Sequence, residues 1–468
     1  MSKKRKSDDT PTPPPQGRGV ADLEEARAWL KARGIQDVEC ILPDQAGVAR
    51  GKMMPTEKFL DGPSMSMPTS IFVQTISGEY PEEDDDFQMD PTDGDLRLEP
   101  DFSTLAVVPW ASDPTAQVIH DAYHRDGRPV DVAPRQVLQR MVNLLDLKGW
   151  RAVVAPEIEF YLVKQNSDPD LPLEPPIGRS GRPEIGRQSY SIAAVNEFDS
   201  LFDDIYAFSE AQGLEIDTLI HEEGAAQMEI NLLHGDPIEL ADQVFLFKRT
   251  IREAALRHNM YATFMAKPMS REPGSAMHIH QSIVDKETGQ NIFSDEDGQP
   301  TKEFFSFIAG QQKYLPRMMC IFAPYVNSYR RLARYTTAPI NVHWGYDNRT
   351  VGLRVPNSGP AARRVENRVP SSDANPYLVL AASLAAGYLG IAQGLSPDDP
   401  IDGSASELPH ELPRGLLEAV ELFWNCDELA EVFGSNFIAT YRAIKQAEYE
   451  TFMRVISPWE REYLLLNV

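Results

Sequence analysis

The chain contains few cysteines and no compact nucleotide-binding loop, and each absence excludes a class of protein. Three cysteines, Cys40, Cys320 and Cys426, occur among 468 residues, far apart and without CxxC spacing. This argues against a disulfide framework and against a thiolate zinc site, and it favours a cytoplasmic location. Neither GxGxxG nor GxxxxGK[ST] occurs. A nucleotide, if one binds, must therefore bind without a Rossmann or Walker loop.

Positive charge and long apolar segments are also scarce. Lys and Arg total 45 against 70 Asp and Glu, which leaves a net charge of −25. Such a surface repels nucleic acid and anionic lipid, so we expect neither a nucleic-acid nor a membrane partner. Residues 1–19 are basic and then proline-rich, and we expect a disordered tail without a signal segment. The uncharged run Tyr377–Ala392 falls short of the roughly 20 apolar residues that span a bilayer, which predicts a core helix.

The remaining sequence predicts two folded parts of the α+β class. An amphipathic helix at Ala21–Ala32 precedes two extended runs, Val38–Pro43 and Val48–Met54, which predict a helix followed by a hairpin. Further strand candidates follow at Leu105–Val108 and Gln117–Ala122. We place a boundary near residue 130, which divides the chain into a tail at 1–19, an N-terminal domain at 20–129 and a large domain at 130–468. No short repeat suggests a solenoid or propeller.

Several predicted strands carry acidic or histidine residues at i and i+2. Glu157 and Glu159 share one face of a strand whose other face is apolar, and His278, His280 and Ser282 share a face of another. Other candidates are Glu366 and the carboxylates that flank a Gly-Ala loop, Glu222 and Glu229. One such pair alone is more often an ordinary sheet face than a metal site.

The donor set consists of carboxylates and imidazoles without thiolates, which favours Mg²⁺ or Mn²⁺ over Zn²⁺. Five arginines lie in the same stretch of sequence: Arg331, Arg349, Arg354, Arg364 and Arg368. Hard divalent ions beside arginines are suited to phosphoryl transfer, because both neutralise charge on the moving phosphoryl group.

Six motifs follow one another in the order typical of one family. They are Ala155–Phe160, Gly224–Glu229, Lys267-Pro268 with Gly274–His280, Asn327–Arg331, Asn348-Arg349 and Arg364–Arg368. Through them, residues 150–380 resemble the catalytic domain of the glutamine synthetase superfamily. Weaker similarity extends into the N-terminal part at Gly51-Lys52 and Leu98–Asp101. The resemblance implies a β-grasp-like N-terminal domain, followed by a catalytic domain with a curved antiparallel sheet flanked by helices.

The resemblance also implies a two-step ligase with two Mg²⁺ or Mn²⁺ ions per active site and ATP as co-substrate. In the family, the γ-carboxylate of glutamate attacks the γ-phosphate of ATP, and an amine then displaces phosphate from γ-glutamyl phosphate. Family active sites lie between neighbouring subunits, so we expect a homo-oligomer, a dodecamer of two hexameric rings.

Roles carry over where the motifs match. The ligands of one metal in the family correspond to Glu159, Glu222 and Glu229. The ligands of the metal that contacts the nucleotide phosphates correspond to Glu157, His278 and Glu366. The α-carboxylate of glutamate matches Arg331 and Arg368, whose forked guanidinium groups suit it. The family's loop glycine whose backbone approaches glutamate corresponds to Gly274. The two arginines that face the phosphates in the family correspond to Arg349 and Arg354. The residues that contact the nucleotide in the family correspond to His280, Ser282 and Arg364. The catalytic arginines implied are Arg331, Arg349 and Arg354.

The sequence departs from ammonia-using members of the family at several positions. Such members carry a glutamate six residues after the arginine that here is Arg331, and an aspartate in the loop that here is Ser66–Ile71. This chain has Thr337 at the first position and no acid in the loop. Two carboxylates that hold ammonium are therefore missing. Ser406 replaces a tyrosine that some bacterial members adenylylate, and Pro273 replaces an asparagine that helps to hold glutamate.

These departures predict a bulkier acceptor. We expect a primary amine, most specifically a polyamine such as putrescine, spermidine or spermine, as in relatives that act in polyamine catabolism. The acidic run Glu82–Asp86 is either an ordinary solvated loop or an attractor for the distal positive charges of such a substrate. Two alternatives stay open: a glutamine synthetase that uses ammonia, and a catalytically silent scaffold protein.

Overall fold

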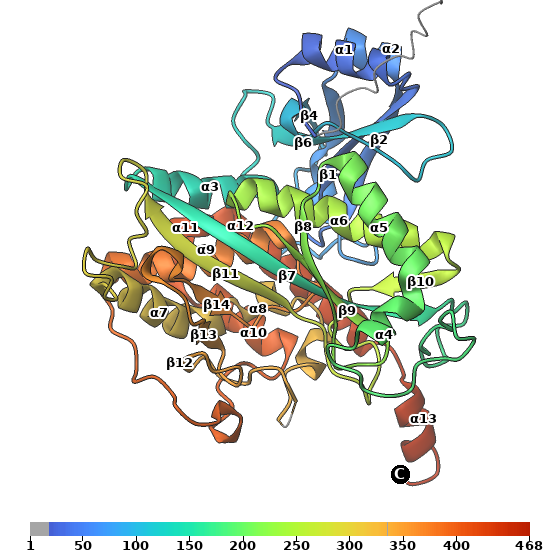
Figure 1. The fold of residues 1–468 in the computed structure, drawn as a ribbon. Coiled ribbons are helices and arrows are strands. Elements are labelled where there is room, and N and C mark those ends of the chain that lie inside the picture. The colour runs from blue at the N-terminus through green and yellow to red at the C-terminus, as the bar shows by residue number, and fades with distance from the viewer. Residues whose placement is uncertain (1–17, 335) are drawn as a thin grey trace, which may run out of the picture.

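The computed structural model describes residues 18–334 and 336–468. Its N-terminal part is a six-stranded sheet with two short helices, shown in blue at the top of Figure 1. The strands run in the order β2-β1-β6-β4-β3, and β5 pairs with β6. The elements are α1 (Leu23–Ala32), β1 (Asp37–Pro43), β2 (Ala49–Pro55), α2 (Thr56–Asp61), β3 (Met65–Pro68), β4 (Asp95–Pro100), β5 (Ala106–Val107) and β6 (Thr115–Tyr123).

The second sheet has eight strands in the order β12-β13-β14-β11-β7-β9-β8, with β10 paired to β7. Its long strands β7 and β11 cross the molecule side by side (Figure 1). All of its pairings are antiparallel except that of β12 with β13. The strands are β7 (Trp150–Lys164), β8 (Ile216–His221), β9 (Gln227–Leu232), β10 (Met260–Thr263), β11 (Met277–Asp285), β12 (Trp344–Tyr346), β13 (Leu353–Val355) and β14 (Val365–Asn367).

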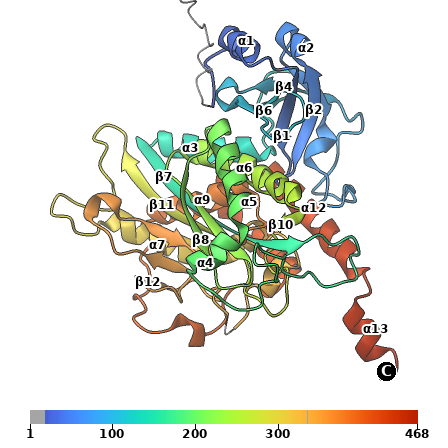
Figure 2. The same ribbon diagram turned by 45° about the vertical axis from the view of Figure 1, so that its right-hand side comes forward.

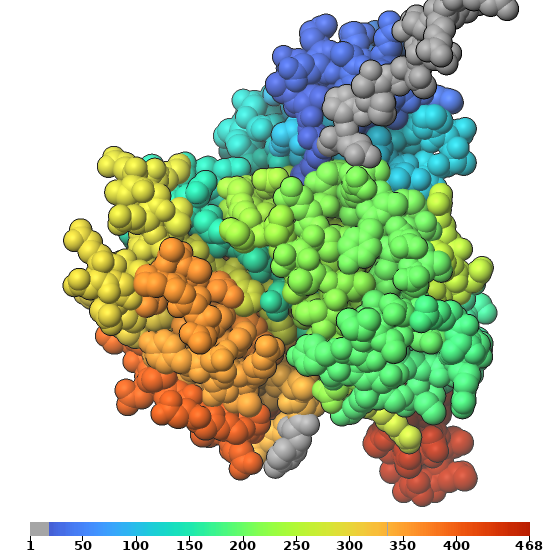
Figure 3. Space-filling view, in the orientation of Figure 1, coloured from blue at the N-terminus to red at the C-terminus, as the bar shows by residue number. Residues whose placement is uncertain are grey.

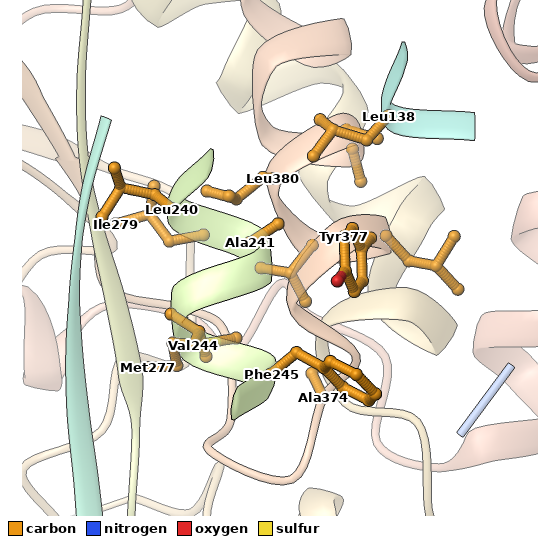
Figure 4. Close-up of a cluster of buried hydrophobic side chains, with 14 of the residues drawn as sticks. Leu138, Leu240, Ala241, Val244, Phe245, Met277, Ile279, Ala374, Tyr377 and Leu380 are labelled. Atoms are coloured by element: carbon orange, nitrogen blue, oxygen red, sulfur yellow. The ribbon is translucent and has the colours of Figure 1, made fainter. Parts of the chain in front are cut away.

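Helices cover this sheet and enclose the main apolar core. Figure 4 shows Val244 of α6 and Tyr377 of α9 in a cluster with Met277 and Ile279 of β11. The helices are α3 (Pro134–Asp146), α4 (Ile192–Val195), α5 (Asp199–Gln212), α6 (Pro237–Arg257), α7 (Lys302–Tyr314), α8 (Met319–Phe322), α9 (Pro376–Gln393), α10 (Leu416–Trp424), α11 (Asp427–Phe433), α12 (Ser435–Met453) and α13 (Pro458–Leu464). The predicted α+β class is confirmed.

Helix α9 confirms the predicted core helix. Asn375 caps its start by accepting hydrogen bonds from two backbone amides, Pro376 occupies its first turn, and Gly394 ends it with φ of +61°. It packs closely on α7, because a Cβ on Gly310 would lie 2.2 Å from the carbonyl oxygen of Ala386. By length and composition α9 could cross a membrane, but 78% of it is buried inside the protein.

The two sheets are joined by a buried charge network. Arg135 of α3 makes ion pairs with Asp101 and Asp121 of the N-terminal part and with Asp242 of α6, at 2.6, 2.7 and 3.0 Å. Most of the expected tail, residues 1–17, lies outside the described residues. At its end, Arg18 makes an ion pair with Asp242 at 3.3 Å.

The C-terminal helix α13 begins with the capping box that the sequence predicts, because Ser457 and Glu460 each bond the backbone of the other. Figure 2 shows α13 projecting from the body of the molecule. Several large apolar side chains around it are exposed, among them Trp459, Leu465 and Leu466.

Candidate active site

Strand pairing brings the acidic and histidine residues of distant segments onto one sheet face. In β7, Ile158 and Phe160 are fully buried, so Glu157 and Glu159 point to the opposite face. Glu157 lies opposite His278 of β11, and Glu159 lies opposite Glu229 of β9. One strand further along, His280 of β11 lies opposite Glu366 of β14.

Glu157 is at the centre of this arrangement. Its Oε2 lies 3.2 Å from Nδ1 of His278, and its Oε1 lies 2.8 Å from Nε2 of His280. Two groups of donors gather within 4.8 Å: Glu157 with Glu229 and His278, and Glu157 with His280 and Glu366. Carboxylate and imidazole donors at such spacing fit Mg²⁺ or Mn²⁺.

Glu159 and Glu222 lie beside these two groups. The Oε1 of Glu159 is 3.9 Å from Nε2 of His278, and both glutamates line the same cavity. His280, which the resemblance places at the nucleotide, lies close enough to Glu157 and Glu366 to be a metal ligand as well. Its i+2 spacing from His278 is the sequence signal for this position.

A cavity of about 500 Å³ encloses the predicted metal and glutamate residues. Figure 3 shows the surface hollowed between the green region around residues 190–230 and the orange region around residues 340–370. Its walls include all predicted metal ligands and Gly274, Arg331, Arg349, Arg354 and Arg368. A second cavity of about 790 Å³ contains the other predicted nucleotide residues, His280, Ser282 and Arg364, and shares Glu157 with the first.

Burial and mutual repulsion shift the pKa values of the acids. Burial raises the pKa of Glu159 to about 8, and the Glu222 carboxylate adds to this rise. Burial raises the pKa of Glu229 to about 9, with repulsion from Glu157 and Glu159. These carboxylic acids resist ionisation, because ionising them together would leave negative charge in the cavity that only a bound cation could neutralise.

Two other glutamates of the site, Glu157 and Glu366, have lowered pKa values. Burial opposes ionisation of Glu157, but hydrogen bonds from His278 and His280 hold its pKa far below the ordinary value. Burial also opposes ionisation of Glu366, but Arg368 and His278 lower its pKa to about 2. Burial lowers the pKa of His278 to about 4, with repulsion from Arg368. His278 is therefore neutral at pH 7, as a metal ligand must be.

The arginines converge on Glu366 and on the backbone behind it. Arg354 donates to Glu366 at 2.8 Å and to Asp347 at 2.7 Å, and Arg368 also pairs with Glu366. Arg331 is buried and donates to the carbonyl oxygens of Val369 and Arg368. The buried Nε atoms of Arg354 and Arg368 have no hydrogen-bond partner among the described residues. Because such donors are costly to leave unpaired, they fit a bound anion.

Gly274 stands against Arg331. A Cβ at this glycine would lie 2.5 Å from Cγ of Arg331 and 2.7 Å from the carbonyl oxygen of Ala266. We expect Gly274→Ala to displace the loop or Arg331 and to lower kcat/KM for glutamate about 100-fold, with a smaller change in KM for ATP. Steady-state kinetics with each substrate varied in turn measures this.

The matched control is Gly359→Ala, because a Cβ at Gly359 meets open space. This variant should keep the kinetics of the unmodified protein. An unchanged glutamate KM and kcat in Gly274→Ala would contradict the placement of glutamate beside Gly274.

The raised pKa values of Glu159 and Glu229 predict that the metal-free protein loses stability as pH rises. An unfolded glutamate titrates near 4.3, so between about pH 5 and pH 9 the folded protein retains protons that the unfolded chain has lost. The free energy of unfolding therefore falls with pH. In EDTA we expect Tm at pH 8.5 to be lower than at pH 6 by about 2 °C or more. Thermal scans at both pH values, with and without Mg²⁺, measure this.

Added Mg²⁺ should raise Tm more at pH 8.5 than at pH 6, because it competes with protons for the same carboxylates. Glu229→Gln removes one of these titrating groups and should flatten the dependence on pH. A metal-free Tm that rises between pH 6 and pH 8.5 would contradict the prediction.

The positions at which the family resemblance implies a difference from ammonia users lie as follows. Thr337 lines the cavity, as do Pro273 and Ser406. Among the described residues of one chain, the segment 66–71 does not line this cavity. It does contact an acid from elsewhere in the chain, because Asp93 accepts hydrogen bonds from Thr69 and Ser70.

All five residues of the acidic run at 82–86 are exposed, and none of them lines either cavity. Asp84 and Asp86 make ion pairs with Arg442 of α12 at 2.9 and 3.1 Å. Of the two interpretations of this run, the contacts within one chain favour a solvated loop anchored to α12.

Sequence reasoning missed one ion pair at the cavity. Glu223 lines the cavity and pairs with Arg187 at 2.5 Å. The two residues are 36 positions apart, and no local pattern in the sequence links them.

Comparisons with known proteins agree with this geometry. Residues 131–464 match the family model of the glutamine synthetase catalytic domain. The chain is 35% identical to gamma-glutamylputrescine synthetase PuuA of Escherichia coli strain K12, with 96% of each chain covered. It is 32% identical to glutamate–isopropylamine ligase of a Pseudomonas species, with 93% of this chain and 96% of the relative covered.

A solved structure also matches nearly the whole chain. The "GmaS/ADP complex-Conformation 1" structure superposes with a TM-score of 0.80 at 27% identity, and the match covers 95% of this chain and 100% of that one.

Proposed function

Because this chain belongs to the glutamine synthetase family, we propose that it is an ATP-dependent ligase that joins the γ-carboxylate of glutamate to a polyamine. An enzyme of the glutamate–amine ligase type is supported by relatives that use putrescine and isopropylamine. The choice of putrescine, spermidine or spermine as the acceptor is the proposal. In the balanced reaction, glutamate, ATP and a primary amine form the γ-glutamyl amide, ADP and phosphate.

One observation carries this proposal. A single cavity combines the acidic and histidine donors, the arginines and a neutral threonine, Thr337, where ammonia users have a glutamate. The carboxylates and imidazoles suit divalent ions and the arginines suit anions. A neutral hydroxyl at position 337 leaves room for an alkylamine but has no charge to hold ammonium.

The family resemblance supports the role of each donor. We assign Glu159, Glu222 and Glu229 to one metal, and Glu157, His278 and Glu366 to the metal nearer the nucleotide. When bound, two Mg²⁺ or Mn²⁺ ions neutralise the phosphate oxygens during transfer. The 3.2 Å contact between Glu157 and His278 supports their assignment to one metal, because it joins donors of two neighbouring strands.

The arginines bind and orient the anionic substrates in this proposal. Arg331 and Arg368, with the Gly274 loop, hold the α-carboxylate of glutamate, so its γ-carboxylate faces the γ-phosphate. Arg349 and Arg354 neutralise charge on the transferring phosphoryl group. His280, Ser282 and Arg364, which line the second cavity, hold the nucleotide.

The γ-carboxylate oxygen attacks phosphorus and ADP leaves. The uncharged amine then attacks the acyl carbon of γ-glutamyl phosphate, and phosphate leaves.

We also propose a dodecamer of two hexameric rings and a cytoplasmic location. The exposed apolar side chains around α13 support contacts between subunits. Three free cysteines support a reducing compartment. The domain division at 20–129 and 130–468 is supported by the separate sheets on either side of it.

One assay tests the function against its alternatives. Phosphate release is measured with glutamate and ATP and, in turn, putrescine, spermidine, spermine, ethanolamine and ammonium. We expect the highest kcat/KM for a polyamine. Ammonium as the best acceptor would make the protein a glutamine synthetase, and no turnover with any amine would favour a scaffold protein.

A further inference from the structure

Glu223 is a carboxylate of the active-site cavity that the proposed metal sites leave unused. Six glutamates line the cavity among the described residues, and five of them, Glu157, Glu159, Glu222, Glu229 and Glu366, belong to the proposed metal sites. Glu223 follows Glu222 where β8 ends and the chain turns towards β9. Its side chain is 29% exposed, so it is accessible to a solute that enters the cavity.

The Glu223 carboxylate already forms an ion pair with an arginine from another segment of the chain. The Arg187 NH1 atom lies 2.5 Å from Oε1 of Glu223, and its NH2 donates to the carbonyl oxygen of Arg271 at 3.4 Å. The Arg187 side chain is 58% exposed. Ion pairs this exposed contribute little to stability, so a cationic solute can compete with Arg187 for Glu223.

The segment that carries Arg187 is fastened to the turn after β8. Glu184 accepts hydrogen bonds from the Ala226 amide and, at 3.1 Å, from Nε2 of His221. The Tyr190 amide donates to the carbonyl oxygen of His221. Ser189, Tyr190 and Ile220 line the same cavity as Glu223. Tyr190 and Ile220 thus bring apolar groups to the cavity that Glu223 lines, and the carbon chain of an amine needs such groups.

Glu223 also lies near the loop where we place glutamate. Pro273 and Gly274 line the cavity with Glu223. The Tyr161 hydroxyl donates to the carbonyl oxygen of Pro273 at 2.8 Å and lies within the electrostatic influence of Glu223. A diamine that extends from the glutamate site to the cavity rim would therefore have its distal charge near Glu223.

We propose that Glu223 binds the distal ammonium group of a diamine or polyamine acceptor and exchanges Arg187 for it. This inference rests on the proposed function. The amino group that reacts must lose its proton before it attacks, whereas the distal group keeps its charge and needs an anionic partner. Glu223 is thus a specificity-determining residue, and Arg187 occupies the place of the substrate cation when no amine is bound.

The test compares two acceptors of equal chain length in the full-length enzyme at saturating glutamate and ATP. Putrescine and butylamine share a four-carbon chain, and only putrescine carries a distal ammonium group. In Glu223→Gln we expect KM for putrescine to rise relative to KM for butylamine by about tenfold or more. Arg187→Gln breaks the same ion pair but leaves the carboxylate free, so KM for putrescine should fall.

Three other outcomes would overturn the assignment of Glu223, and they show whether the proposed function fails with it. If Glu223→Gln and Arg187→Gln change KM for both amines by the same factor, the ion pair merely fastens the rim and the assignment is overturned. If the unmodified enzyme turns over putrescine and Glu223→Gln keeps its KM ratio, the assignment fails and the proposed function stands. If the unmodified enzyme turns over no amine, the proposed function fails and the assignment falls with it.

Discussion

Glu157→Gln is expected to lower phosphate release with glutamate, ATP and amine about a thousandfold while the protein stays folded. Glu157 belongs to both donor groups and to the walls of both cavities. Glutamine keeps the size of the side chain but lacks its negative charge. The proposed metal held by Glu157, His278 and Glu366 should therefore bind more weakly. Coupled phosphate-release kinetics measures the first effect, and calorimetric Mg²⁺ titration measures the second.

The control for this prediction is Glu287→Gln, because Glu287 is exposed beyond the end of β11. It makes the same chemical change outside the cavity and should keep full activity. Circular dichroism should be the same for both variants. If Glu157→Gln kept activity within a few-fold of the unmodified protein, the proposed metal sites would be wrong.

Thr337→Glu is expected to shift the acceptor preference towards ammonium. The substitution places a carboxylate on the cavity wall, at the position where the family resemblance implies one in ammonia users. A negative charge there should bind ammonium, and its bulk and hydration should hinder an alkyl chain. We expect the ratio of kcat/KM for ammonium to that for putrescine to rise about tenfold or more. The assay is phosphate release with each acceptor varied in turn.

Thr337→Gln separates the charge of the new side chain from its size. Glutamine has nearly the volume of glutamate, so it should hinder putrescine without improving the use of ammonium. If Thr337→Glu and Thr337→Gln gave the same ratio, the missing carboxylate would not explain the choice of acceptor.

Local patterns were sufficient to predict most of the elements near the site. Asn375-Pro376 and Gly394 bracket α9, and the capping box precedes α13, because caps depend on residues within one turn. The alternation of Glu157 and Glu159 with Ile158 and Phe160 predicts which face of β7 is buried. This orientation follows from the two-residue period of a strand.

The partners of these side chains depend on strand register. The Oε1 of Glu157 contacts His280 because β11 pairs with β7 in one register across more than 120 residues of chain. A shift by one residue would turn His278 and His280 away from Glu157. No local pattern predicts this register. From the sequence alone, His280 is therefore assigned to the nucleotide, and its position opposite Glu366 is not predicted.

Ion pairs between loops are still less predictable. Arg187 and Glu223 meet because Glu184 and Tyr190 fasten the 184–190 segment to the end of β8. The hydrogen bonds of Arg331 to the backbone of residues 368 and 369 likewise depend on how two distant segments pack.

The amino-acid order thus determined what each segment can do by itself: the types of donor, the face of each strand that bears them and the ends of the helices. These properties arise from residues within a few positions of one another. Only the tertiary structure decided that Glu157 serves two donor groups and that Glu223 stands apart from both with Arg187. Such contacts join residues distant along the chain, and their geometry follows from the packing of the whole sheet and its loops.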